Sequence, residues 1–319
     1  MNSRIFLVIN PRSSGFDLVE NKILKPLYAS SLKDREIFTF EIQPTSPLEN
    51  AKEIAKTLRD GDTILVAGGD GTAHIATNGA TLSGKNHIKI KYTGFGNFND
   101  YAHSFSKNSG KAMVEAVKTG KVKATIRPLE IRVNGKFLTH APLYATVGIT
   151  AEMAEIFEGK RLRKTLKKVK GRNSRLALSL LAATRFYFNN RHKHILKISK
   201  IEVKEENEDT SKNFTVPPKT TDLVFLNGPR MARIMRSRIN LADAENFGFT
   251  AMNAGDFRSN LPFLVRGFLG KIPLKRVKSA KISFEKPTKL TIQIEGEAQV
   301  LQNVETLEVS ISNQKIEVL

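Results

Sequence analysis

The segment of this chain with the clearest capacity for chemistry is Gly68-Gly69-Asp70-Gly71-Thr72. It follows the apolar run 64–67, which predicts a buried parallel strand, and it precedes a stretch with a helical pattern. Glycines at such a junction let a ligand approach the backbone, and the start of the helix offers free N–H groups to an anion. Because a carboxylate repels phosphate, we expect Asp70 to orient a hydroxyl, a proton or a metal ion beside one. The alternative is a tight turn in which Asp70 only caps the helix.

A second group of polar residues follows the apolar run 5–9, which predicts the first strand. Asn10 and Ser13 are expected to lie beside the glycine loop, because open α/β sheets bind ligands at the carboxyl ends of their strands. Arg12 is a candidate phosphate partner, and the competing interpretation is an exposed surface arginine.

In order along the chain, these segments resemble the motifs of the diacylglycerol kinase catalytic family, which includes bacterial lipid kinases and the sphingosine and ceramide kinases. NAD kinases share the glycine loop. The motifs concerned are Asn10-Pro11-Arg12-Ser13-Ser14-Gly15, the glycine loop, Gly94 to Ala102, Phe225-Leu226-Asn227-Gly228-Pro229 and Glu295-Gly296-Glu297.

The resemblance implies roles for four of these five motifs. The phosphates of ATP would be held by Gly68, Gly69, Gly71 and Thr72, together with Asn10, Arg12 and Ser13. Asn97 and Asp100 would contact the nucleotide and shape its site. Glu297 would be the general base that takes the proton of a lipid hydroxyl, with Asp70 close by as a second catalytic carboxylate. Mg²⁺ is expected to accompany ATP.

Two departures from the family pattern bear on these expectations. Phe95 stands where the family has a threonine, and two residues are inserted before Asp100. Phe247-Gly248 and Ala251 occupy positions where bacterial members carry carboxylates associated with a structural metal, and hydrophobic side chains cannot bind Mg²⁺. We therefore expect that structural site to be absent or rebuilt, and we assign no metal ligands. His74 lies near the glycine loop and is a weaker candidate for a phosphate contact.

The order of predicted elements indicates an α/β domain followed by a β-rich one. Strand and helix patterns alternate up to about residue 126, which implies a parallel sheet covered by helices, and short alternating strands dominate afterwards. We expect a nucleotide-binding α/β domain over residues 1–126 and a sandwich-like lipid-substrate domain over 127–305. A tail at 306–319 could pack back on the first domain. The resemblance names this architecture as the NAD kinase/diacylglycerol kinase-like fold. The predicted strands are 5–9, 37–42, 63–67, 87–92, 124–133, 136–147, 194–203 and 223–226, and the predicted helices are 18–31, 48–58, 73–82 and 107–119. Ser46 or Thr45 is the expected N-cap of the second helix, with Pro47 in its first turn, and Asn134-Gly135 predicts a hairpin turn. Alternating strands are expected from 277 to 318, with turns at Lys286-Pro287, Glu295-Gly296 and Asn313-Gln314.

The charge of the chain points to a polyanionic partner. The formal net charge is +20, with no cysteine to form a disulfide or a thiolate metal site. Two basic stretches with apolar residues, 160–188 and 258–281, suggest an anionic membrane surface, although a solvated helix face is the plainer interpretation. No apolar run approaches the roughly 20 residues that span a bilayer. We therefore expect a cytoplasmic protein, peripheral to the inner face of the membrane.

Taken together, the sequence predicts an ATP-dependent lipid kinase that phosphorylates diacylglycerol or a related lipid. A catalytically impaired homologue that still binds nucleotide or lipid is the main alternative, and NAD kinase is a further one. A nucleic-acid-binding protein is supported by charge alone, so no nucleic acid is expected as partner. The choice of lipid, the nucleotide preference and the formation of a homodimer stay open.

Overall fold

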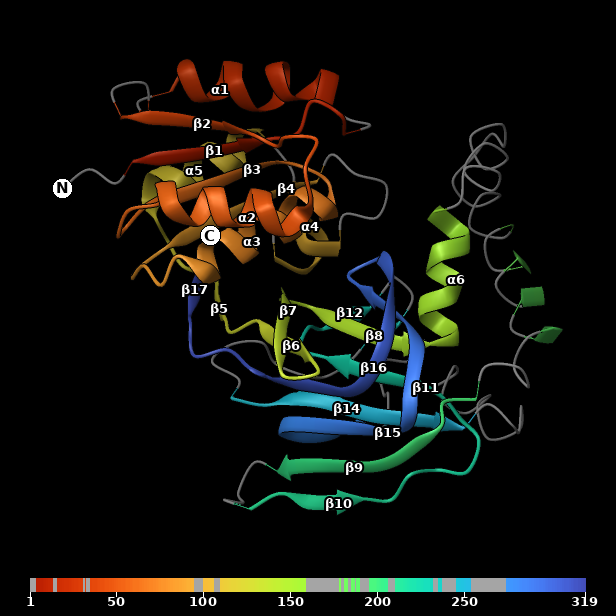
Figure 1. Ribbon diagram of the computed structural model, residues 1–319. Helices are drawn as coiled ribbons and strands as arrows, with labels where there is room; N and C mark the ends of the chain where they lie inside the picture. Colours follow the sequence, from red (N-terminus) through yellow and green to blue (C-terminus); the bar gives the residue numbers. More distant parts are fainter. Residues whose placement is uncertain are drawn as a thin grey trace.

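The computed structural model describes residues 4–13, 16–30, 32, 35–94, 100–105, 110–158, 178, 181–182, 185–186, 188–189, 195–205, 210–231, 235–236, 245–253 and 274–319. Its strands form two main sheets, one six-stranded and one nine-stranded, which lie in two lobes (Figure 1). The first lobe is an α/β layer structure and the second is dominated by antiparallel strands, so the predicted fold class is confirmed.

The first sheet has the strand order β2-β1-β3-β4-β17-β5. All neighbours pair in parallel except β17 and β5, which are antiparallel. The last strand of the chain thus lies between β4 and β5 rather than at an edge. The bounds are β1 (Ile5–Ile9), β2 (Ile37–Glu41), β3 (Thr63–Gly68), β4 (Lys89–Gly94), β5 (Ala124–Ile126) and β17 (Ile316–Val318).

Helices cover both faces of this sheet, because successive residues of each strand point to opposite sides. Phe6 and Val8 of β1 share a core with α2 (Pro47–Thr57) and α3 (Asp70–Leu82). Ile5 and Leu7 face the other way and share a core with α5 (Gly110–Thr119) and the segment before β2. That segment was predicted as one helix and is instead divided into η1 (Phe16–Leu18), η2 (Glu20–Leu24) and α1 (Lys25–Tyr28).

The second sheet curls around its own core. The long strand β15 (Lys275–Ile294) pairs near its start with β14 and β9, and pairs at its last residues with β8. Apolar side chains from all these strands meet in one cluster. The remaining strands are β6 (Leu129–Val133), β7 (Lys136–Ala141), β8 (Tyr144–Gly148), β9 (Ile198–Glu205), β10 (Lys212–Phe214), β11 (Thr220–Leu226), β14 (Phe247–Asn253) and β16 (Glu297–Ile311). A two-stranded ribbon, β12 (Arg230–Met231) with β13 (Met235–Arg236), lies apart from it.

The two lobes are joined by a common core and by polar contacts. The core cluster that contains α3 and α4 (Asp100–Phe105) also contains Tyr144 and Leu226 of the second sheet. Asn78 of α3 hydrogen-bonds to the backbone of β7 at His140. The helix that begins at the glycine loop therefore rests directly on the second lobe. Helix α6 (Ile149–Glu158) follows β8 and packs on β15 and β16.

Candidate active site

The glycine loop connects β3 to α3 and is held against the neighbouring strand end. Gly69 is the N-cap of α3 and the helix begins at Asp70, three residues earlier than its pattern predicts. Ile9 pairs with Ala67, so Asn10 lies beside the loop, and its Nδ2 donates to Oγ1 of Thr72 at 3.2 Å. The first turn of α3 leaves its N–H groups without partners inside the helix, as every helix start does.

The polar residues after β1 form a turn of their own. Oδ1 of Asn10 accepts the backbone N–H of Arg12 at 3.1 Å. The exposed Arg12 side chain donates from Nη2 to the carbonyl of Ile42 at 3.3 Å, just beyond β2. The hydroxyl of Ser13 is buried and finds no hydrogen-bond partner among the described residues. Such an atom fits a ligand that would complete its hydrogen bonding.

Asp70 is oriented by a second helix. Its Oδ1 accepts the backbone N–H of Tyr101 at 3.3 Å, in the first turn of α4. Tyr101 packs against Tyr92 with 4.8 Å between ring centroids, which fixes α4 against β4. The side chain of Asp100 is not described, and Asn97 and Phe95 lie outside the described residues, so their predicted roles stay predictions.

Glu297, distant in sequence, lies against the glycine loop. It is the first residue of β16 and its side chain is exposed. A Cβ atom added to Gly71 would overlap Oε1 of Glu297 and would lie 3.3 Å from its Cδ. The carboxylate therefore occupies the space that any side chain at position 71 would take, next to Asp70 in the chain.

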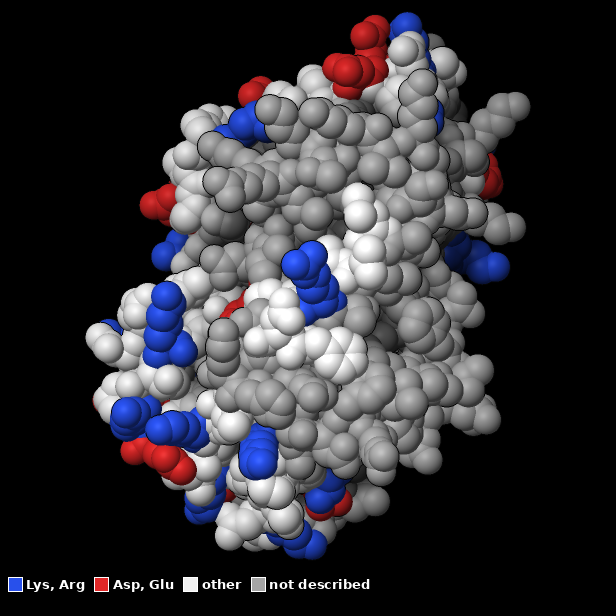
Figure 2. Space-filling view, turned by 90° about the vertical axis from the view of Figure 1, so that its right-hand side faces the viewer, with Lys and Arg blue, Asp and Glu red and all other residues white. Residues whose placement is uncertain are grey.

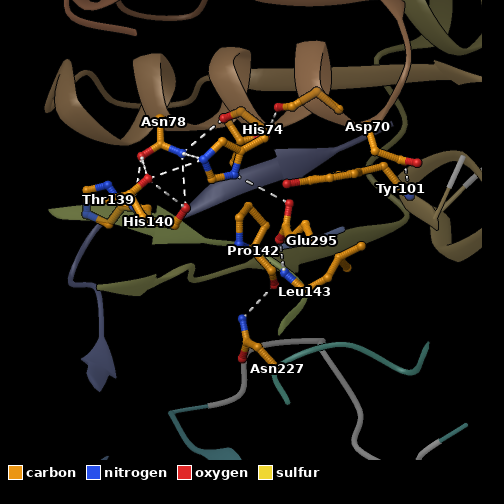
Figure 3. A network of polar contacts seen from close by, with 12 residues as sticks. Asp70, His74, Asn78, Tyr101, Thr139, His140, Pro142, Leu143, Asn227 and Glu295 are labelled. Carbon is orange, nitrogen blue, oxygen red and sulfur yellow. Dashed lines mark hydrogen bonds and ion pairs between the residues drawn. The ribbon is translucent and has the colours of Figure 1, made fainter. Parts of the chain in front are cut away.

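A buried polar network lies one turn farther along α3 (Figure 3). Asp70, His74 and Asn78 follow one another at the spacing that places them on one helix face. Nδ1 of His74 faces Oε2 of Glu295 at 3.6 Å, and Nε2 lies 3.2 Å from the hydroxyl of Thr139. His74 thus points into the second lobe, which gives its ring other partners than the phosphate contact considered from sequence.

The other charged and aromatic groups here are strongly affected by burial. Burial lowers the pKa of His140 to about 4, although the nearby Glu130 carboxylate acts in the opposite direction. That ring is therefore neutral near pH 7. Burial also raises the pKa of Tyr92, whose hydroxyl lies 2.9 Å from that of Thr77. The buried region between the two lobes therefore favours uncharged side chains, and a charged side chain there needs a partner of opposite charge or a hydrogen bond.

The donor set suits a nucleotide accompanied by Mg²⁺. In the part of the chain that is described, no three acidic or histidine side chains are grouped as ligands for a metal held by protein alone. Mg²⁺ beside a nucleotide usually uses one or two carboxylates together with phosphate oxygens and waters. Asp70, at the start of α3, can supply such a carboxylate.

Other predicted features lie elsewhere. Phe247 is buried against Phe225 in the core of the second sheet, and Ala251 packs on the same core. Most of the basic stretches 160–188 and 258–281 lies outside the described residues. Among the residues described, no helix has both the length and the apolar character needed to cross a membrane.

Comparison with known proteins gives one family and one fold. Residues 4–130 match the family model of the diacylglycerol kinase catalytic domain. The structure of a diacylglycerol kinase from Bacillus anthracis str. Sterne is similar with a TM-score of 0.61 at 16% identity, covering 99% of this chain and 96% of that one. A further structure from that strain, described as a proposed diacylglycerol kinase, gives 0.62 at 17% identity and covers 99% and 97%. At these identities the likeness concerns the fold. No curated protein matches the sequence.

Proposed function

We propose that this chain, whose residues 4–130 belong to the diacylglycerol kinase catalytic family, is an ATP-dependent lipid kinase. The acceptor would be a hydroxyl of diacylglycerol or a related lipid. The observation that carries this proposal is the contact of the Glu297 carboxylate with Gly71 of the nucleotide loop. A general base must lie within reach of the proton it removes, and the donor phosphate must lie in line with the same hydroxyl.

The residues of the loop would act mainly by positioning and charge. The N–H groups at the start of α3 and the hydroxyls of Thr72 and Ser13 suit phosphate oxygens. When bound, ATP would supply the phosphoryl group, and Mg²⁺ would neutralise the negative charge of its phosphates. Glu297 would take the proton of the lipid hydroxyl while the new oxygen–phosphorus bond forms and the bond to the ADP oxygen breaks. Asp70, oriented by the N–H of Tyr101, would stand beside the phosphates.

The surface of the second lobe agrees with an anionic membrane as the place of action. Figure 2 shows lysine and arginine side chains spread over that lobe, with fewer acidic ones among them. Some of them are paired, as Lys275 is with Glu205 and Lys281 with Glu308. Each such pair neutralises one positive charge, whereas the net charge of +20 over the whole chain still favours an anionic surface.

The test is transfer of radiolabelled phosphate from ATP to a panel of lipids in mixed micelles with Mg²⁺. We expect Glu297→Gln to lower kcat by about 10²- to 10⁴-fold, the range for loss of a general base. Asp70→Asn should also lower it. Glu305→Gln, an exposed glutamate on the same strand as Glu297, is the matched control and should leave kcat unchanged.

Equal silence of the wild type and both variants across the panel would refute the kinase assignment. Calorimetry with Mg-ATP then identifies the impaired homologue, which binds nucleotide without turnover. A spectrophotometric assay for NADP formation tests the NAD kinase alternative separately.

A further inference from the structure

The turn that precedes Glu297 has an unusual composition for its geometry. It joins β15 to β16 through Glu295 and Gly296, with φ angles of +53° and +96°. A two-residue hairpin turn with both φ angles positive favours Asn-Gly or Asp-Gly, because longer side chains are strained in the left-handed region. A glutamate at this position needs compensation from its surroundings.

The compensation comes from the side chain of Glu295, which is buried although it lies in a turn. Its relative exposure is only 1%, and Oε1 accepts the backbone N–H of Leu143 at 2.6 Å. Oε2 faces Nδ1 of His74 at 3.6 Å. Glutamate is almost never buried to this extent without a partner, so these contacts hold the carboxylate in place.

Both partners of Glu295 are themselves fixed. The Pro142–Leu143 segment is bound by Asn227, whose Nδ2 donates to the carbonyl of Pro142 at 2.9 Å and whose backbone N–H donates to that of Leu143 at 2.8 Å. Asn227 belongs to the Asn-Gly-Pro segment whose role the sequence left open. In the structure, Asn227 binds the Pro142–Leu143 segment, and Leu143 in turn binds Glu295 at the hairpin tip.

His74 is fixed by the network around Asn78. The side-chain oxygen of Asn78 accepts the N–H of His140 at 2.8 Å and the hydroxyl of Thr139 at 3.1 Å. Nε2 of His74 lies 3.2 Å from the Thr139 hydroxyl and 3.3 Å from Nδ2 of Asn78. Since an amide nitrogen can only donate, Nε2 accepts there, and the ring proton of the neutral imidazole lies on Nδ1. The imidazole is thereby turned so that Nδ1 faces Glu295 (Figure 3).

The hairpin tip therefore meets one face of α3 at two points. Glu295 lies at His74, and Glu297, two residues later, lies at Gly71. Residues three apart on a helix share a face and are separated by about 4.5 Å along the axis. The first contact is buried and fixed, whereas the second is exposed and belongs to the reactive carboxylate.

We propose that Glu295 is a positioning residue, held by Leu143 and His74, that fixes the carboxylate of Glu297 against the nucleotide loop. Its role in catalysis rests on the proposed kinase function, whereas its anchoring of the hairpin does not. Without this anchor, the tip would be set only by the strand pairing of β15 with β16.

The discriminating variant is Glu295→Asn. Asparagine before Gly296 suits the turn better than glutamate does, but its shorter side chain cannot reach both Leu143 and His74. We expect a melting temperature that changes little, because the better turn residue offsets the loss of the buried bond to Leu143. We also expect a kcat lower by about 100-fold from misplacement of Glu297, and a KM for ATP that stays within about twofold. Glu295→Gln keeps the acceptor for Leu143 and should restore part of kcat. If Glu295→Asn folds poorly, Glu295→Gln is compared with the wild type in its place.

Hydrogen–deuterium exchange makes the test independent of any substrate. Glu295→Asn should increase deuterium uptake in peptides that cover residues 69–75 and 295–301, whereas Glu305→Gln should not. Unchanged uptake overturns the proposal, and so does increased uptake with a wild-type kcat. If the wild type has no kinase activity but the uptake still rises, the kinase function fails while the anchor stands.

Discussion

Replacement of Gly71 by alanine separates the function of the loop from the stability of the helix that it begins. The new methyl group would overlap Oε1 of Glu297, which is the mobile end of an exposed side chain and can move away. Alanine is also the better helix former, by up to about 1 kcal/mol. We therefore expect the free energy of unfolding to stay level or to rise by as much as about 1 kcal/mol.

The same substitution should abolish most activity. Relief of the overlap moves the carboxylate by about 1 Å, and a displacement of that size costs about 100-fold in rate. Phosphate transfer to lipid micelles gives kcat, and urea unfolding gives stability. A variant with wild-type kcat would show that the contact between Glu297 and Gly71 has no part in the reaction.

Gly79 on the same helix supplies the opposite control. A Cβ at this position would lie 2.5 Å from Cγ2 of Ile54 and 3.1 Å from the carbonyl of Ala51, inside the contact of α2 with α3. Gly79→Ala should therefore destabilise the protein by about 1–3 kcal/mol through overpacking. Because position 79 lies about two turns beyond the loop, kcat of the folded enzyme should be kept.

Two further predictions concern buried carboxylates. Burial raises the pKa of Asp222 to about 6 from an ordinary value of 3.8, outweighing its bonds to Thr150 and Thr221. Its protonated form is favoured in the folded state, so this contribution to stability is complete below about pH 4 and is lost as pH rises through about 6. In Asp222→Asn the amide oxygen can accept the N–H of Thr150 and the amide nitrogen can donate to the hydroxyl of Thr221. Urea unfolding should therefore show that the stability of this variant relative to the wild type rises by up to about 3 kcal/mol between about pH 4 and pH 8. A difference that decreases as pH rises would contradict this. Arg4 makes a two-point contact with Asp62, at 2.7 and 3.2 Å, with both side chains buried. Arg4→Met should cost about 3–5 kcal/mol by leaving that carboxylate unpaired, and double replacement with Asp62→Leu should recover much of the loss.

Local signals in the sequence identified most element ends correctly. Of the two predicted caps, Ser46 is the one that caps α2, in a reciprocal pair of bonds with Glu49, and Pro47 lies in the first turn, as predicted. Asn134 and Gly135 form the predicted turn with positive φ at both residues. Such signals need only neighbouring residues, and this is why they can be recognised without a structure.

Longer-range features were harder to predict. The strand expected over 124–133 is divided at Arg127-Pro128, since its first part joins the first sheet and its second part joins the other. The turn expected at Lys286-Pro287 is wrong, because β15 continues through it. Its pairing with β16 shifts between Ser283 and Thr288, and a bulge accommodates a residue without an N–H.

In the candidate site, too, short motifs were recognised from sequence, whereas contacts between distant segments were not. Asp70 and Glu297 were singled out by motif, and the structure adds the contact of Glu297 with the loop. The roles of Glu295 and Asn78 were missed, since the network around them joins segments between 60 and about 220 residues apart in sequence. The one available signal was the glutamate in a turn where asparagine is the usual choice.

The position of β17 has a consequence for how the protein is made. A chain leaving the ribosome presents β1 to β4 early, yet the strand that fills the space between β4 and β5 follows the strands of the second sheet in sequence. Until then the open edge of β4 is available to any other extended segment, which is a risk for aggregation. The first sheet can thus be completed only after the strands of the second sheet have been synthesised, and a fragment ending after β5 would keep that edge uncovered.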